Sequence, residues 1–257
     1  MNILLNGMSG FMGREVVKLC DRNYRGAKLA FGIDPNASTN GYKSFDEIVS
    51  LDGVDCIIDF SHHSATPALL DFATQNKLPL VLCTTGHTEE EKELINKASS
   101  SIPLFYSGNM SLGIALLVEL AKTTAKAFPE AEIEIIEKHH DRKIDAPSGT
   151  ALMLADAICE VRPEAYTNCG RSGQGKRTAE EIGIHSIRMG NIVGEHQVII
   201  GTESQTITLK HEAHNRALFA EGAIAAADFL IGQPAGMYDM KSMLSGEKET
   251  DAVITAE

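Results

Sequence analysis

The sequence has no excess of basic residues. Its 257 residues include 23 Lys and Arg against 35 Asp and Glu, which gives a net charge of -12 at pH 7 and a pI of about 5.2. A general nucleic-acid-binding protein needs a basic face that neutralises phosphates, so we exclude nucleic acid as a partner. An acidic small molecule would need a local basic pocket.

Closely paired cysteines and long apolar runs are also missing. The five cysteines contain no C-x-x-C pair, so we expect reduced thiols rather than a disulfide framework or a zinc knuckle. The N-terminal stretch MNILLNGMSG lacks the basic lead and the apolar centre of a signal peptide. The longest apolar run, residues 113–121, is too short to cross a bilayer. We therefore expect a soluble, cytoplasmic protein without a membrane partner.

What the sequence does contain is a regular alternation of strand and helix patterns. Short apolar runs alternate with helical spacing through residue 110, which predicts a parallel sheet with right-handed crossovers. The expected strands are residues 2–7, 28–34, 54–61, 79–86 and 102–110. The expected helices are residues 11–23, 44–53, 64–77 and 88–101.

This rhythm changes after the stretch SLGIALLVELAKTTAKAF, residues 111–128. Residues 131–140 alternate apolar and polar side chains, which is typical of a half-exposed strand. A helix is expected over residues 149–161, and residues 182–214 predict three strands in an antiparallel pattern. An apolar helix over residues 217–232 should pack back on the first domain. The predicted fold class is α/β, a Rossmann-type doubly wound parallel sheet with a second, mixed α+β domain.

Three glycines follow the first expected strand: Gly7, Gly10 and Gly13. Glycines between a strand and a helix let the backbone approach a pyrophosphate at the helix N-terminus. The spacing G-x-x-G-x-x-G is close to the common dinucleotide fingerprint without matching it, and purely structural turns use such glycines as well. The place of these glycines, after a strand and before a helix, favours a dinucleotide-binding turn.

The second expected strand ends at Asp34, 21 positions after Gly13. An acidic residue at this place accepts hydrogen bonds from the hydroxyls of an adenosine ribose. The next residue is Pro35 instead of an arginine that would hold a 2′-phosphate, so the sequence favours NADH over NADPH. The alternatives are a solvated strand-end aspartate and a positive charge supplied by Lys43 or His62.

The ends of the later strands are further candidates, because the ligand of a doubly wound sheet lies across the carboxyl ends of its strands. This nominates Phe60-Ser61, residues 84–86 and residues 107–110 as cofactor contacts. Each of these segments is equally compatible with an ordinary turn.

Residues 137–151, EKHHDRKIDAPSGTA, gather an unusual amount of polar chemistry. Ser148 stands just before an apolar helix, whose free N–H groups would receive a carboxylate; a plain N-cap is the alternative. His139 and His140 would point to opposite sides of a strand, so that one could face a ligand. A histidine near pH 7 gives or takes a proton, and Lys143 supplies a positive charge or a proton.

A metal site is the remaining alternative, because histidines also occur later in the chain. His211 and His214 have three-residue spacing, but no cysteine or carboxylate cluster completes a zinc set. We therefore expect no metal.

Five segments together, GMSGFMGR, CTTG, EKHHDRKIDAPSGTA, GNIVGEH and LKHEAHNRALFAEGA, resemble the 4-hydroxy-tetrahydrodipicolinate (dihydrodipicolinate) reductases of bacterial diaminopimelate and lysine synthesis. The resemblance runs from the first strand nearly to the C-terminus. It implies reduction of a cyclic unsaturated imine dicarboxylate with NADH or NADPH by a homotetramer. It further implies a dinucleotide-binding domain over residues 1–110 and 220–257, and a substrate-binding and oligomerisation domain over residues 111–219.

The resemblance also assigns roles by position. His139 matches the acid/base residue and Lys143 the proton donor, and which of the two protonates the product stays open. His140, Gly149 and Thr150 match substrate-binding positions, to which the helix-cap argument adds Ser148. The residues that match or are expected to form cofactor contacts are Gly7, Met8, Ser9, Gly10, Phe11, Met12, Asp34, Cys83, Thr84, Thr85, Ser107, Gly108, Asn109 and Met110.

The sequence departs from the family pattern at two places, Pro35 and the pair Asp141-Arg142, where Asp141 lowers the local positive charge. Two rival functions also deserve comparison. A semialdehyde-type dehydrogenase needs a nucleophilic cysteine, for which Cys83 is the candidate. A nucleotide sensor that lost its chemistry has no need of His139 and Lys143 beside a carboxylate receiver.

Overall fold

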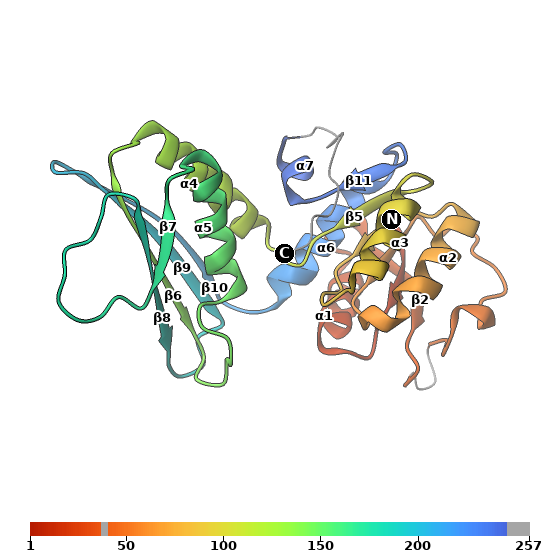
Figure 1. The fold of residues 1–257 in the computed structure, drawn as a ribbon. Coiled ribbons are helices and arrows are strands. Elements are labelled where there is room, and N and C mark those ends of the chain that lie inside the picture. Colours follow the sequence, from red (N-terminus) through yellow and green to blue (C-terminus); the bar gives the residue numbers. More distant parts are fainter. Residues whose placement is uncertain (37–40, 246–257) are drawn as a thin grey trace. The chain divides into compact units, whose positions relative to one another are not determined.

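The computed structural model describes residues 1–36 and 41–245 and divides into two compact units (Figure 1). The first unit combines Met1–Ser111 with the chain from Arg216 onward, and the second unit is Leu112–Asn215. Each unit has its own hydrophobic core.

The first unit is built on a six-stranded parallel sheet with the order β11-β5-β4-β3-β1-β2. The chain steps from β1 to β2 on one side and then continues through β3 on the other, so the topological switch point lies between β1 and β3. The predicted fold class is thereby confirmed, although β11 was not predicted, because three residues carry too little pattern. The strands are β1 (Asn2–Asn6), β2 (Lys28–Ile33), β3 (Cys56–Asp59), β4 (Leu80–Leu82), β5 (Pro103–Tyr106) and β11 (Gly236–Tyr238).

Helices lie on both faces of this sheet (Figure 1). Leu104 of β5 joins the core under α2 and α3, whereas the next residue, Phe105, packs edge-on against Phe229 of α6. α6 also packs against α1 and contacts β3, β4 and β5. The helices are α1 (Phe11–Asp21), α2 (Thr66–Asn76), α3 (Glu89–Ser99), α6 (Ala217–Leu230) and α7 (Met240–Ser245), with 3-10 turns η1 (Tyr24–Gly26), η2 (Phe45–Glu47) and η3 (His63–Ala65).

The helix expected over residues 44–53 is wrong, because only the 3-10 turn η2 forms there. Phe45, Ile48 and Leu51 pack against the core from a largely extended segment. Here a three-residue spacing of apolar side chains belongs to a short 3-10 turn and the chain that follows it. Spacing in the sequence alone does not distinguish this arrangement from a helix.

The second unit is a five-stranded mixed sheet with the order β10-β9-β6-β8-β7. Helices α4 and α5 pack against each other and against one face, where they share the core cluster with the inward residues of the sheet. The strands are β6 (Glu132–His139), β7 (Tyr166–Cys169), β8 (Glu181–Arg188), β9 (Gly194–Gly201) and β10 (Thr206–Ala213), and the helices are α4 (Leu112–Ala127) and α5 (Gly149–Val161).

The expected antiparallel arrangement of the three late strands is only partly right. β9 and β10 pair antiparallel, but β8 pairs with β6 in parallel, and β6 lies between β8 and β9. α5 leads to the edge strand β7, and the connection after β7 then places β8 between β7 and β6, parallel to both. β7 was not predicted, because its four residues, YTNC, are polar and mostly exposed.

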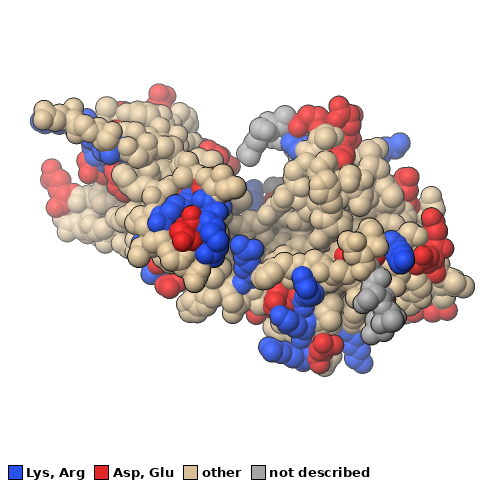
Figure 2. Space-filling model, turned by 90° about the horizontal axis from the view of Figure 1, so that it is seen from below, with Lys and Arg blue, Asp and Glu red and all other residues tan. Residues whose placement is uncertain are grey.

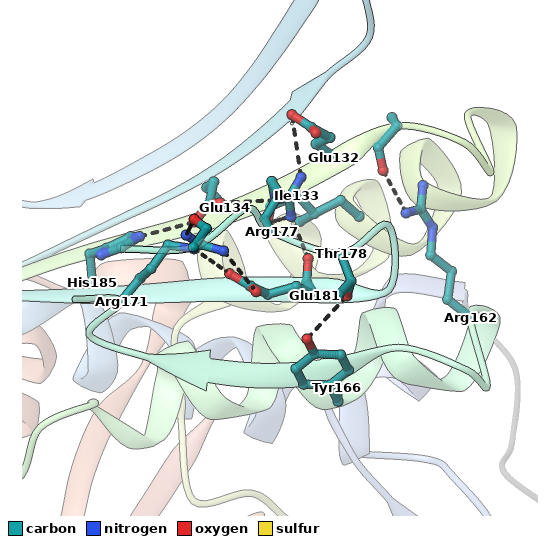
Figure 3. Close-up of polar contacts among 12 residues, drawn as sticks. Glu132, Ile133, Glu134, Arg162, Tyr166, Arg171, Arg177, Thr178, Glu181 and His185 are labelled. Carbon is teal, nitrogen blue, oxygen red and sulfur yellow. Dashed lines mark hydrogen bonds and ion pairs between the residues drawn. The ribbon is translucent and has the colours of Figure 1, made fainter. Parts of the chain in front are cut away.

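Ion pairs fasten the long connection between β7 and β8 to the beginning of β6 (Figure 3). Arg177 lies 3.7 Å from Glu134, which also contacts His185 at 2.9 Å. Arg171 pairs with Glu181 at 2.8 Å. These contacts lie at the opposite end of β6 from His139, so they support the sheet without touching that histidine.

Charges of both signs are interspersed on the face of the molecule that Figure 2 draws. On the face drawn in Figure 2, Lys and Arg side chains form small groups among neutral and acidic ones rather than one continuous basic area. Within residues 1–36 and 41–245, no helix has the length and apolar character needed to cross a membrane.

Candidate active site

The glycine turn between β1 and α1 is a tight backbone cradle. Gly7 has a φ of 81°, and a Cβ there would lie 2.5 Å from the Phe60 carbonyl oxygen. A Cβ on Gly13 would lie 2.2 Å from the Gly7 carbonyl oxygen. Both glycines are therefore required by the fold itself. The turn also lies at the switch point of the sheet, where ligands bind in doubly wound folds.

α1 begins at this turn without a side-chain cap. Its N-cap is Gly10, and its first turn contains no acidic residue, so its N–H groups and positive dipole end are suited to an anion. Phe11 is 55% exposed, and the Arg216 guanidinium lies over its ring, 5.4 Å from the centroid. Sequence reasoning missed Arg216 as a site residue, because nothing in the chain order brings residue 216 beside residue 11.

Asp34 follows β2 and is buried against the glycine turn. Its carboxylate accepts a hydrogen bond from the Ser9 N–H at 3.0 Å and from the Asn36 N–H at 2.8 Å. The structure thus brings Ser9 and Asp34 together, as a ribose and pyrophosphate site requires. Pro35, the next residue, is exposed.

The carboxyl ends of β1, β3 and β4 meet at Asp59, which sequence reasoning missed. Its fully buried carboxylate accepts hydrogen bonds from Asn6 at 2.7 Å, from the Ser61 hydroxyl at 2.6 Å and from the Thr84 hydroxyl at 2.5 Å. Burial raises the pKa of Asp59, although these hydrogen bonds favour its charged form. The signal was an aspartate in the otherwise apolar strand VDCIID. Asp59 fixes the segments that border the switch point.

The segments after β4 and β5 lie side by side. A Cβ on Gly108 would lie 3.4 Å from the Thr85 methyl group. Met110 is buried against α6, where a Cβ on Gly222 would lie 1.7 Å from the Met110 carbonyl oxygen. The carboxyl edge of the first sheet therefore assembles all three nominated segments, and the glycine cradle beside an uncapped helix fits a dinucleotide.

In the second unit, β6 ends at His139, whose Nδ1 lies 2.5 Å from Oε2 of Glu137. Burial lowers the pKa of His139, and Glu137 offsets this only in part. Glu137 is fully buried, and Arg188 of β8 contacts both its oxygens, at 2.6 and 2.8 Å. Burial alone would raise the pKa of Glu137, but the hydrogen bonds from Arg188 and His139 lower it to about 2. Sequence reasoning missed Glu137 and Arg188.

Ser148 is the N-cap of α5, which was the alternative to a direct role in receiving a carboxylate. Its hydroxyl accepts a hydrogen bond from the Ala151 N–H at 3.2 Å and also bonds Nε2 of the buried His196 at 3.0 Å, while its own N–H donates to Glu137 at 3.1 Å. The Ser148 side chain is thus occupied inside the protein. Gly149, the first residue of the helix, is exposed, and a Cβ there would meet no atom within 4 Å.

The loop between β6 and α5 carries Lys143, which pairs with Asp145 at 2.9 Å. The Lys143 N–H donates to the His140 carbonyl, and His140 itself is partly buried just after the end of β6. Asp141 pairs with its exposed neighbour Arg142 at 3.0 Å. The second unit therefore gathers the predicted substrate and proton-transfer residues at the end of β6 and the start of α5.

No group of three His, Cys, Asp or Glu side chains in the described part of the chain is arranged to hold a metal ion.

A doubly wound sheet with this glycine cradle is the architecture of dinucleotide-binding proteins, a class that includes many oxidoreductases. Similarity to known proteins specifies the family. The family model described as "Dihydrodipicolinate reductase, N-terminus" matches residues 1–110, and "Dihydrodipicolinate reductase, C-terminus" matches residues 113–244. The chain belongs to the dihydrodipicolinate reductase family, so the resemblance noted in the sequence is confirmed.

Individual relatives agree with this assignment. The chain is 44% identical to the 4-hydroxy-tetrahydrodipicolinate reductase of Clostridium tetani, covering 95% of this chain and 97% of that one. It is 43% identical to the enzyme of the same name from Caldanaerobacter subterraneus subsp. tengcongensis, covering 95% and 98%. A solved dipicolinate-bound dihydrodipicolinate reductase from Paenisporosarcina sp. TG-14 has a TM-score of 0.78 at 25% identity, covering 93% and 97%.

The predicted function is confirmed at the level of the reaction. The chain is an oxidoreductase that reduces 4-hydroxy-tetrahydrodipicolinate with NAD(P)H in diaminopimelate and lysine biosynthesis.

Proposed function

We propose that the second unit binds the cyclic dicarboxylate at the start of α5 and that His139 and Lys143 handle the proton. The observation that carries this is Gly149, which is exposed at the first position of the helix with open space around it. Helix N-termini bind carboxylates through unpaired N–H groups. Lys143 on the preceding loop completes the proposed carboxylate-binding site together with His140 and Thr150. Ser148 contributes to this site as the buried N-cap of the helix.

The two proton-handling residues have different proposed roles. Burial lowers the pKa of His139, so its imidazole is neutral at pH 7, and Nδ1–H donates to Glu137. Nε2 is then the atom that accepts a proton. Lys143 is the residue proposed to deliver a proton to the charge developing on the ring. The bound reduced nicotinamide supplies the hydride.

For the cofactor, we propose NADH as the preferred donor, with NADPH also used. Asp34 is buried beside the glycine turn, where it can accept the ribose hydroxyls. Pro35 offers no charge for a 2′-phosphate. The remaining proposed contacts are Gly7, Met8, Gly10, Phe11, Met12, Cys83, Thr84, Thr85, Ser107, Gly108, Asn109 and Met110.

We further propose that residues 1–110 and 220–257 bind the dinucleotide and that residues 111–219 bind substrate and form a homotetramer. Ile136, Ile187 and Ile199 lie on the sheet face opposite α4 and α5, which gives that face apolar side chains for contact with another copy. The cytoplasm is the proposed compartment, because the five cysteines are free.

The semialdehyde-dehydrogenase alternative is disfavoured by Cys83. Burial raises the pKa of the Cys83 thiol well above its usual range, so the thiolate needed for nucleophilic attack is scarce. Thiol alkylation of the folded protein should leave turnover intact.

A coupled assay tests the cofactor preference. Purified protein is added to pyruvate, aspartate semialdehyde and the synthase that condenses them, and oxidation of NADH and of NADPH is followed separately. Oxidation that depends on the synthase and is faster with NADH supports the proposal, whereas a clear preference for NADPH would contradict the role given to Asp34-Pro35.

The catalytic assignment is tested with His139→Gln and Lys143→Ala. Each should lower kcat by about 10²- to 10⁴-fold, the usual contribution of a positioned acid or base, with little change in the Kd of NADH measured by fluorescence. Equal loss of NADH binding would refute the assignment.

A further inference from the structure

We propose that Glu137 is a positioning residue for the reduction: it fixes the ring of His139 and, through the same carboxylate, the start of α5. This inference rests on the proposed function, because it assigns Glu137 a role that acts through His139. Nothing in the reaction requires Glu137 to touch the substrate or the cofactor.

The first argument is the placement of the carboxylate. Glu137 and His139 are two residues apart in β6, so both side chains project to the face of the sheet covered by α4 and α5. Glu137 is 0% exposed, and its Oε2 lies 2.5 Å from His139 Nδ1. A carboxylate at Nδ1 holds the proton there, which leaves the Nε2 lone pair free for proton transfer.

The second argument is that the same carboxylate also binds the proposed substrate helix. Oε1 of Glu137 accepts the N–H of Ser148, the N-cap of α5, at 3.1 Å. One buried side chain thus joins the acid/base residue to the helix start that receives the dicarboxylate. Because Glu137 bonds both, a displacement of His139 would also displace the start of α5, and the reverse. Misplacement of catalytic groups lowers the reaction rate.

The third argument is that neighbouring strands keep Glu137 ionised and the ring in place. Arg188 grips both carboxylate oxygens and also donates to the Asp145 carbonyl at 2.6 Å, in the loop that carries Lys143. The ring of His196 from β9 meets the His139 ring edge-on at 5.2 Å. A bidentate, buried Arg-carboxylate pair is strong and geometrically specific.

The Nε2 atom of His139, which is proposed to accept the proton, has space beside it. Gly194 of β9 lies beside His139 Nε2, where a Cβ would come within 3.2 Å. The charged and titratable groups that act on His139 are Glu137 from its own strand, Arg188 from β8, His196 from β9 and Lys143 from the loop. Glu137 is the only anion among these groups, so removing its charge should shift the pKa of His139 in one direction, downward.

Glu137→Gln keeps the shape of the side chain and removes its charge. A carboxylate stabilises the imidazolium, so its loss should lower the pKa of His139 further. The limb of the kcat/KM profile that reports His139 should then move to lower pH by the same amount. We expect kcat to fall at least about tenfold, with the KM for NADH unchanged.

A matched control comes from the same strand. Glu134 also pairs with a histidine, His185 at 2.9 Å, but at the other end of β6 (Figure 3). Glu134→Gln should leave kcat and the pH profile unchanged. A comparable loss in this variant would show that any Glu-His pair of the sheet matters, and would overturn the special role of Glu137.

The double variant separates positioning from mere support of the fold. If Glu137 acts through His139, then Glu137→Gln should add little to the loss already caused by His139→Gln. The inference would be overturned if the kcat losses of the two single variants multiplied in the double variant and Glu137→Gln left the pH profile unshifted. If His139→Gln alone turns over normally, it is the proposed function that fails, whatever Glu137→Gln does.

A measurement on the unchanged protein covers the case in which Glu137→Gln does not fold. The ¹⁵N chemical shifts of the His139 ring report which nitrogen carries the proton in the neutral form. The inference expects the proton on Nδ1. A proton on Nε2 would overturn it.

Discussion

At the scale of single residues, glycines in this protein serve two different needs. Gly7 and Gly13 are required because backbone atoms approach them more closely than a Cβ allows. Gly149 is different, since it has an ordinary helical position with open space around it. The fold does not demand glycine there, so the space beside the helix start is available to a ligand.

This contrast predicts the behaviour of Gly149→Ala. Alanine at a compatible helical position should leave stability unchanged or raise it by about 0.4–1 kcal/mol. The added methyl group projects into the proposed carboxylate receiver, so the Kd for dipicolinate, measured by calorimetry, should rise severalfold. Unchanged dipicolinate binding would move the substrate site away from α5. Gly13→Ala is the contrasting control, because its Cβ meets the Gly7 carbonyl and should lower stability in urea unfolding.

A second residue-scale prediction concerns the cofactor. Pro35→Arg places a guanidinium next to Asp34, where it can bind a 2′-phosphate in a charge-assisted pair worth about 1.5–3 kcal/mol. The ratio of kcat/KM for NADPH to that for NADH should therefore rise about tenfold or more in the coupled assay. An unchanged ratio would mean that the adenosine ribose is not bound at Asp34.

At the scale of elements, the sequence predicted those whose signals are local. The five main strands of the first sheet and the start of α5 after Ser148 follow from apolar runs and helical spacing. The pairing of β8 with β6 was not predictable in this way, because register depends on contacts between distant segments. That register sets His139 opposite Arg188, and it is what brings Arg188 to Glu137. The contacts that hold Glu137 therefore escaped prediction, whereas the catalytic assignment of His139 and Lys143 stays a prediction.

The capping box of α3 gives a prediction at this scale. The Thr88 side chain accepts the Glu91 N–H at 3.3 Å, and Glu91 accepts the Thr88 N–H at 2.8 Å. Thr88→Ala should cost about 1 kcal/mol in urea unfolding. Thr74→Ala is the matched control, because Thr74 bonds carbonyls inside α2 and alanine is the better helix former. An equal cost in both variants would contradict the role of the cap.

The second hydrogen bond of the capping box, from the Thr88 N–H to the Glu91 carboxylate, depends on pH. The hydrogen bond from the Thr88 N–H lowers the pKa of Glu91, and His63 adds to the effect. A carboxylate of this kind stabilises the fold above its unfolded pKa, and the stabilisation is lost as the pH falls through the folded pKa. The stability difference between the unchanged protein and Glu91→Gln should consequently shrink in acid.

At the scale of the whole molecule, the chain forms two cores, and the proposed cofactor and substrate tasks fall to different ones. The unit that contains the glycine turn returns at Arg216 to add α6, β11 and α7, while Leu112–Asn215 forms a separate sheet with its own helices. Neither the cofactor cradle nor the proposed proton-transfer residues are spread over both cores. We therefore expect NADH alone to stabilise the first unit, and the dicarboxylate alone to stabilise the second.

Amide hydrogen exchange tests this division. NADH should slow exchange in the turn from Gly7 to Gly13, whose N–H groups face the proposed pyrophosphate, and dipicolinate alone should slow exchange at Gly149 and Thr150. In Gly149→Ala the dipicolinate effect should disappear while the NADH effect persists, which separates a lost site from a lost fold. Protection of the glycine turn by dipicolinate without NADH, with α5 unaffected, would place the dicarboxylate in the first unit and refute the assignment of the two tasks.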